Sequence, residues 1–216
     1  MKLFLKLAAV VLFLASPFSH AQIQKSLIGF QGTPWGSSIA TVKAKFPSAK
    51  EFDTCKMFSS TKNNYEALKS EAKSSNSSCQ YLKIEDYVIE GLKFSAAFNF
   101  DTQNKLTFVT LTYLRQQIES ENYASECTAA YNRISVLLES RYGDYSNVNN
   151  LDDFGKDYER YSIKAWAPLP SEVWVANLSG DKFINKMATE LNKPVLDVCK
   201  VKINYSRKVP SEAYKL

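Results

Sequence analysis

Two Ser-x-x-Lys sequences are the parts of the chain that come nearest to a catalytic motif. They are Ser59-Ser60-Thr61-Lys62 and Ser70-Glu71-Ala72-Lys73. In penicillin-recognising enzymes, SDN and KTG sequences accompany a serine and a lysine at this spacing. This chain contains neither accompanying sequence, and both serines fall in a stretch rich in Ser, Lys and Asn. Because that composition produces the spacing by chance, we predict no catalytic residue.

The N-terminus has the features of a secretory signal peptide. A basic start is followed by an apolar run from Leu7 to Ser16, and small residues stand at Ser19 and Ala21. This pattern predicts a signal peptide over residues 1–21 and a single α+β domain over residues 22–216. The apolar run is shorter than the ~20 residues that span a bilayer, and no cysteine stands at the cleavage point. We therefore expect a periplasmic or secreted protein with no stable membrane anchor.

Histidine is absent from the predicted mature chain, because the single histidine, His20, lies in the leader. Ser-His-Asp and Cys-His catalysis need an imidazole, and most zinc enzymes use a histidine ligand. These classes are excluded. Removal of Lys2 and Lys6 also lowers the 27 basic side chains to 25, against 22 acidic ones, for a net charge of +3. With both signs interspersed, this balance indicates a solvated surface and no nucleic-acid partner.

Four cysteines, Cys55, Cys79, Cys127 and Cys199, stand far apart without a CxxC pair. In an exported chain an even number of cysteines indicates disulfides, here two. Three pairings are possible. Cys55 and Cys79 bracket a polar segment that has little core of its own, which favours a bond between them. Cys127 would then pair with Cys199.

An acidic and aromatic segment between two predicted elements is the candidate binding surface. Rigid aromatic rings add contact area at a small cost in conformational entropy, and acidic side chains attract a basic partner. We predict that another protein binds here, through Tyr145, Asp152, Asp153, Phe154 and Tyr158. Asp152, Asp153 and Asp157 also offer carboxylates for calcium, but their spacing is not that of an EF-hand. No metal or cofactor is therefore predicted.

The apolar periodicity predicts a helix, three strands, a second helix and three further strands. The first helix runs from a serine cap through Ile39, Val42 and Phe46, and a polar segment with one short helix follows at 53–78. The order suggests two αβββ units that share one sheet. The later elements are strands at 81–89, 94–100 and 106–113, a helix at 123–142, strands at 161–167, 172–178 and 196–205, and a short helical stretch at 183–191.

Three segments resemble small exported proteins of Gram-negative bacteria that open with F-x-G-x-x-W-G. They are FQGTPWGSSIATVKAKFP, FSAAFNFDTQNKLTFVTLTY and ESRYG. The general architecture is similar to the β-lactamase-inhibitor-protein and outer-membrane-assembly lipoprotein type. The resemblance implies an α+β fold in which helices cover one face of an antiparallel sheet, and it implies binding without catalysis. The missing lipidation cysteine departs from the assembly lipoproteins.

We therefore expect an exported, non-enzymatic binding protein of the bacterial periplasm, such as an inhibitor, an immunity protein or an envelope-associated factor. The alternative is a histidine-free enzyme that acts on cell-wall or sugar substrates through carboxylates. The sequence offers acidic residues for that chemistry but no recognisable pair.

Overall fold

The computed structural model describes residues 27–116, 121–147, 158–167, 171–182, 185–186, 190 and 198–207. The predicted signal peptide lies outside the described residues, as does most of the helical stretch predicted at 183–191. The elements in chain order are β1 (Gly29–Phe30), β2 (Thr33–Pro34), α1 (Ile39–Lys45), β3 (Lys50–Asp53), α2 (Thr54–Phe58), α3 (Lys62–Ser74), β4 (Gln80–Ile89), β5 (Leu92–Phe100), β6 (Leu106–Gln116), α4 (Tyr123–Tyr142), β7 (Ser146–Asn147), β8 (Tyr158–Trp166), β9 (Ser171–Asp181) and β10 (Val198–Arg207).

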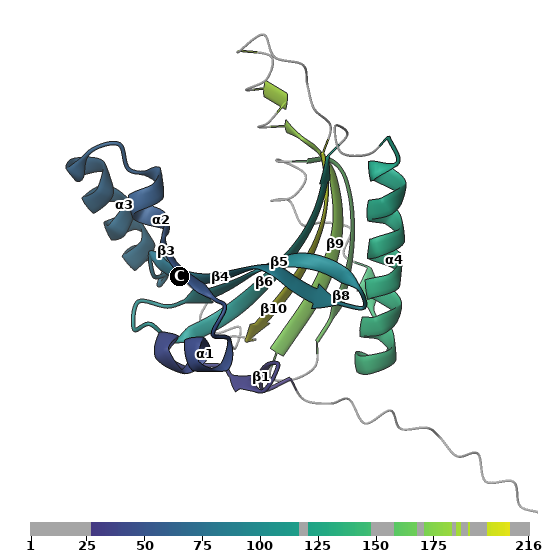
Figure 1. The fold of residues 1–216 in the computed structure, drawn as a ribbon, viewed down its shortest axis with the longest axis horizontal. Helices are drawn as coiled ribbons and strands as arrows, with labels where there is room; N and C mark the ends of the chain where they lie inside the picture. Colours follow the sequence, from purple (N-terminus) through teal and green to yellow (C-terminus); the bar gives the residue numbers. More distant parts are fainter. Residues whose placement is uncertain are drawn as a thin grey trace, which may run out of the picture.

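An eight-stranded antiparallel sheet forms the centre of the fold, in the order β3-β4-β5-β6-β10-β9-β8-β7. The predicted meander of β4, β5 and β6 is present, and β10 pairs with β6, so that Val201 lies opposite Tyr113. The last strand of the chain therefore joins the two halves of the sheet (Figure 1). The α+β class with an antiparallel sheet, predicted from the sequence, is confirmed. The short edge strands β3 and β7 have no apolar alternation and are not among the predicted strands.

The strands bury one face because their side chains alternate with a period of two. Phe94, Phe98, Val109 and Leu111 have no exposed surface. Phe98 pairs in register with Val109, and both belong to the main core cluster. The apolar alternation along β5 and β6 is therefore the pattern that builds the core.

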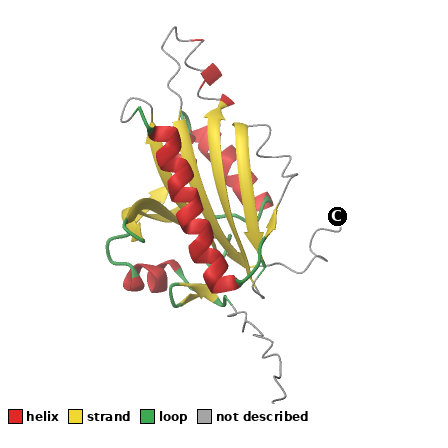
Figure 2. Ribbon diagram, turned by 90° about the vertical axis from the view of Figure 1, so that its right-hand side faces the viewer, coloured by secondary structure: helices red, strands yellow, loops and turns green. Residues whose placement is uncertain are grey.

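The helices α1 and α4 pack on this same face. Ser38 caps α1, because its side chain accepts a hydrogen bond from the backbone N–H of Thr41. The helix α4 has the predicted bounds and ends at Gly143, whose φ of +83° suits a residue without a side chain. Val42 of α1 and Ile134 of α4 are buried in the same core cluster. Figure 1 shows the sheet bent, with both helices on the outer side of the bend, and Figure 2 shows α4 lying along the strands.

The F-x-G-x-x-W-G segment forms a small hairpin that closes one end of the core. Phe30 is 2% exposed and its ring lies 5.2 Å from that of Tyr205. Gln31 and Gly32 make the turn with positive φ angles, which glycine adopts without strain. The Nε1 of Trp35 donates hydrogen bonds to the carbonyl of Leu27 and to Oγ of Ser171. This motif therefore has a structural role.

The segment predicted to be polar with one short helix instead forms two helices, α2 and α3, that stand away from the sheet (Figure 1). No residue of α3 is buried. The disulfide Cys55–Cys79, with Cα atoms 5.3 Å apart, ties α2 to the residue before β4. We call residues 54–78 the arm.

Candidate functional site

The face of the sheet opposite α1 and α4 is the candidate surface. Strand pairing places its residues in rows that cross the sheet, and no helix in the described part of the chain packs across it. One row runs through Lys50, Lys83, Ala97, Thr110, Asn204, Trp174 and Ala165, and the next through Ser95, Thr112, Lys202, Ala176 and Ile163. The flanking rows contain Phe52, Tyr81, Asn99, Phe108, Ser206 and Glu172 on one side, and Leu114, Lys200, Leu178 and Tyr161 on the other. We call these four rows the open face.

The centre of the open face carries small side chains. Ser95, Ala97, Thr110 and Thr112 are half-buried on β5 and β6. Thr110 Oγ1 donates a hydrogen bond of 3.1 Å to Oδ1 of Asn204 on the neighbouring strand β10. We call these small side chains the floor of the open face, and a polar contact between strands helps to hold it in place.

Aromatic side chains lie at the β3 end of the open face. Phe52 and Tyr81 stack with ring centroids 5.3 Å apart, and the hydroxyl of Tyr81 lies 4.0 Å from Sδ of Met57 in the arm. Met57 is 59% exposed and Phe58 is 74% exposed. Apolar area thus continues from the sheet onto α2.

The β8 end of the open face has its own small core. Tyr158, Ile163, Ala176 and Leu178 are buried there, and the half-buried Trp174 packs against them. The small residues of β5 and β6 therefore lie between this cluster and the aromatic pair at the other end.

A partly buried ion pair lies beside this cluster. Lys200 Nζ is 2.8 Å from Oδ2 of Asp181 and 5.5 Å from the centre of the Tyr158 ring. Burial alone would lower the pKa of Lys200, but the hydrogen bond from Lys200 to Asp181 and the nearby charges raise it above its ordinary value. The lysine therefore remains a cation at neutral pH, and its charge is balanced by Asp181.

The structure separates the two tyrosines that were predicted to act together. Tyr145 is half-buried on the helix-covered face, where its ring lies 5.7 Å from that of Trp166 and 4.1 Å from Lys164 Nζ. Tyr158 is 7% exposed and belongs to the cluster on the open face. The other predicted partner-binding residues, Asp152, Asp153 and Phe154, lie outside the described residues.

The predicted disulfide pairs are both present. Cys55 pairs with Cys79, and Cys127 of α4 pairs with Cys199 of β10, with Cα atoms 6.3 Å apart in the second pair. Asp53 lies close enough to Cys55 and Cys79 for the three to resemble a metal site among the described residues. Both thiols are used in the disulfide, so the group offers a single carboxylate and does not fit a metal ion.

The two Ser-x-x-Lys sequences lie on the arm. Ser59 donates a hydrogen bond to the carbonyl of Lys56, and Ser70 and Lys73 are exposed on α3. Neither serine has the enclosed position that a serine nucleophile needs.

Comparisons of the chain with protein-family models, with curated protein sequences and with solved structures find no match. No helix in the described ranges is long and apolar enough to cross a membrane.

Sequence reasoning did not find the open face, because its rows combine residues from distant strands. The signal that could have indicated this face is the set of residues that alternate with the buried ones along each strand. Along β5 and β6 the positions between buried residues are occupied by Ala, Ser, Asn and Thr and by one aromatic residue, Phe108, not by the Lys and Glu typical of a solvent-facing strand.

Proposed function

We propose that this protein is an exported, non-enzymatic binding protein of the bacterial periplasm that holds another protein against its open face. The observation that carries the proposal is a face of an eight-stranded sheet that no described helix covers. Its small side chains on β5 and β6 are half-buried, and aromatic side chains lie at both ends of the face. Interfaces between proteins are enriched in Trp, Tyr and Phe at their centres. This face offers Trp174, Tyr81 and Phe108 as half-buried anchors.

The shape of the sheet supports a protein partner. The small side chains of Ala97, Thr110 and Thr112 let another backbone approach closely, and the aromatic side chains at the two ends can pack against it. Figure 1 shows the open face on the inner side of the bend in the sheet. A convex element of a partner would bury area against both ends at once. The resemblance to proteins in which helices cover one face of a curved sheet is consistent with binding on the opposite face.

The strand order favours two αβββ units. The strands β4, β5 and β6 follow α1 and the arm, β8, β9 and β10 follow α4, and β6 and β10 meet in the middle. In this proposal each unit contributes half of the open face, and the binding surface crosses the seam between them.

The periplasmic location follows from the predicted leader, and two disulfides are compatible with an oxidising compartment. In this proposal Tyr158 is part of the binding surface, where it belongs to the buried cluster against which Trp174 packs. We also keep Asp152, Asp153 and Phe154, which precede Tyr158 in the chain. Tyr145 supports β8 from the other side of the sheet.

Site-specific photocrosslinking tests the proposal. A photoreactive phenylalanine analogue is placed at Thr110 on the open face or at Val136, which is 65% exposed on the outside of α4, and each variant is expressed in the periplasm. We expect a discrete crosslinked protein from position 110 and none from position 136. After that protein is identified, Trp174→Ala should weaken its binding by about 2 kcal/mol or more, and Val136→Ala should leave binding unchanged. Crosslinking from position 136 alone, or unchanged binding by Trp174→Ala, would overturn the proposal.

A further inference from the structure

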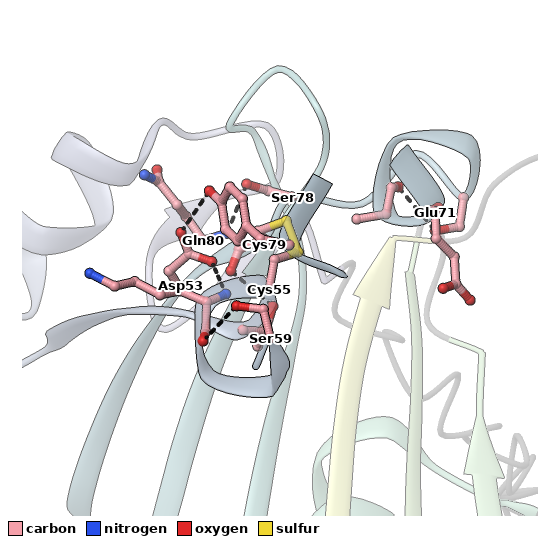
Figure 3. The surroundings of a disulfide bond; sticks show 12 residues. Asp53, Cys55, Ser59, Glu71, Ser78, Cys79 and Gln80 are labelled. Carbon is pink, nitrogen blue, oxygen red and sulfur yellow. Dashed lines mark hydrogen bonds between the residues drawn. A yellow bond between two sulfur atoms is a disulfide. The ribbon is translucent and has the colours of Figure 1, made fainter. Parts of the chain in front are cut away.

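A cavity of about 360 Å³ lies where the arm meets the end of the sheet. The helix α3 forms one side, and the turn between β5 and β6 and the residues before β4 form the other. Polar and charged groups project into it from Asp53, Lys69, Lys73, Ser78, Thr102 and Asn104. Figure 3 shows Asp53, Ser78 and Gln80 around the disulfide Cys55–Cys79, which holds this region together. The volume is at the small end of the range for ligand pockets.

Two lysines give the cavity its charge. Lys69 and Lys73 stand one turn apart on α3, so both side chains project on the same side of the helix. Neither forms an ion pair within the described ranges, in contrast to Lys43 with Glu51 and Lys83 with Glu85 on the sheet side. The cavity therefore presents two ammonium groups that no described carboxylate balances directly.

Asp53 is the one carboxylate in the lining, and its oxygens are already engaged. Oδ1 accepts the backbone N–H of Lys56 at 2.9 Å and thereby caps α2. Oδ2 accepts the hydroxyl of Tyr65 at 3.3 Å. With one acid against two lysines, the cavity keeps a net positive charge.

Hydroxyl and amide groups face the lysines across the cavity. Ser78 Oγ bonds to Oδ1 of Asn104 at 3.2 Å, which orients the amide of Asn104 and leaves its Nδ2 without a partner among the described residues. Thr102 lies with Asn104 in the turn between β5 and β6, and its hydroxyl donates a hydrogen bond to Oδ1 of Asn76. Such groups can exchange hydrogen bonds with the hydroxyls of a ligand while the lysines neutralise its charge.

We infer that this cavity binds a small hydroxylated oxyanion, about the size of one sugar unit carrying a carboxylate or a phosphate. The lysines neutralise the charge of the ligand, and the Asn104 amide and the serine and threonine hydroxyls orient it through hydrogen bonds. This site is separate from the open face, so it stands or falls independently of the proposed function.

The test is a titration followed by two-dimensional amide NMR at low salt. The probes are glucuronate, glucose 6-phosphate and, as a neutral comparison, glucose. We expect saturable shifts at Lys69, Lys73, Gln80 and Asn104 with at least one of the two anions and none with glucose. Whichever anion binds distinguishes a carboxylate from a phosphate ligand.

Two double variants that lose the same charge distinguish a specific anion site from general electrostatic attraction of anions to the protein. Lys69→Gln with Lys73→Gln removes both lysines of the cavity, and Lys45→Gln with Lys62→Gln removes two exposed lysines that are not in its lining. We expect the first pair to weaken anion binding by about tenfold or more and the second pair to leave it nearly unchanged. Asn104→Ala should weaken binding without any change of charge.

Three results would overturn the inference. One is that neither anion gives saturable shifts at the cavity residues. Another is that both double variants weaken binding equally, which would indicate screening of net charge. The third is that glucose binds as well as the anions. The lysines of α3 are all exposed, so their replacement should not unfold this helix. The helical signal in the far-ultraviolet circular dichroism spectrum of each variant checks this.

Discussion

The indole Nε1 of Trp35 donates a hydrogen bond of 2.7 Å to Oγ of Ser171, a residue 136 positions away in the chain. Ser171 has no exposed surface, and its own hydroxyl donates to the carbonyl of Leu27. One buried serine therefore ties the N-terminal hairpin to the first residue of β9. Trp35 Nε1 also donates to the carbonyl of Leu27 at 3.3 Å, so removal of the serine hydroxyl breaks two hydrogen bonds and leaves this donor and this acceptor with their longer mutual one.

Replacement of Ser171 by Ala should lower the free energy of unfolding by about 1–3 kcal/mol, because two hydrogen bonds are lost and each contributes about 0.5–1.5 kcal/mol. Chemical denaturation followed by tryptophan fluorescence measures this change. The matched control is Ser206→Ala, because Ser206 is half-buried on β10 and makes no hydrogen bond with its side chain in the described structure. Equal stability of the two variants would show that the Trp35–Ser171 contact adds nothing.

The elements that the sequence predicted well are those with a strong local signal. The helix at 123–142 has apolar residues on one side and a glycine at its end, and the structure gives it the same bounds. The alternation of Phe94, Phe98 and Phe100 predicted β5 in the same way. In both cases the residues that fix the element lie within the element or directly beside it in the chain.

What the sequence could not predict depends on neighbours that are far apart in the chain. Thr110, Asn204 and Trp174 form one row of the open face only because β10 inserts between β6 and β9. The charges of Glu159 and Arg160 interrupt the apolar pattern, so the sequence predicts a strand only from Tyr161, whereas β8 begins at Tyr158. Of the two tyrosines that the sequence predicts to bind a partner, Tyr158 therefore lies in the cluster on the open face, and Tyr145 lies on the face that the helices cover.

The disulfide Cys127–Cys199 should contribute strongly to global stability. It joins α4 to β10 across the main core and closes a loop of 72 residues, for which the chain-entropy model gives about 4 kcal/mol. Replacement of both cysteines by Ala should lower the denaturant midpoint by a corresponding amount. The loss should be seen equally by tryptophan fluorescence and by far-ultraviolet circular dichroism, because the bond lies within the cooperative core. A midpoint within error of the unmodified protein would contradict this prediction.

The disulfide Cys55–Cys79 should have a local effect instead. The arm that it closes buries no residue of α3 and packs little against the sheet. Replacement of both cysteines by Ala should therefore make residues 56–78 sensitive to limited proteolysis while the thermal midpoint of the sheet changes by only a few degrees. Hydrogen exchange that becomes fast in α3 and stays slow in β5 and β6 would support this reading. Loss of protection throughout the sheet would show that the arm belongs to the cooperative core.

Tyr158 should act as a structural support for the open face. Its ring is buried among Ile163, Ala176 and Leu178, so Tyr158→Ala should lower the free energy of unfolding by about 3–5 kcal/mol, as for other large aromatic truncations in a core. Tyr161→Ala, at a ring that is 36% exposed, should cost much less. Thermal melting of both variants measures the difference. Similar melting of the two would place Tyr158 at the surface and return it to the set of direct contact residues.

Tyr205 should make the protein less stable at alkaline pH. Burial raises the pKa of Tyr205 well above its ordinary value of about 10, and burial also raises the pKa of Tyr142 and Tyr87 nearby. The nearby Arg141 lowers the pKa of Tyr205, but this effect is smaller than that of burial.

Because the folded state keeps the Tyr205 proton above pH 10 while the unfolded state releases it, the unfolded state binds fewer protons. Stability is therefore complete below about pH 10 and falls as the pH rises from there toward the folded pKa, by at most about 1.4 kcal/mol per pH unit for each such tyrosine. Tyr205→Phe should make this fall shallower and change stability little at pH 7, since the ring still packs against Phe30. Urea unfolding from pH 7 to pH 12 provides the measurement. An unchanged slope between pH 10 and pH 12 in the Phe variant would mean that the hydroxyl of Tyr205 is hydrated in the folded protein.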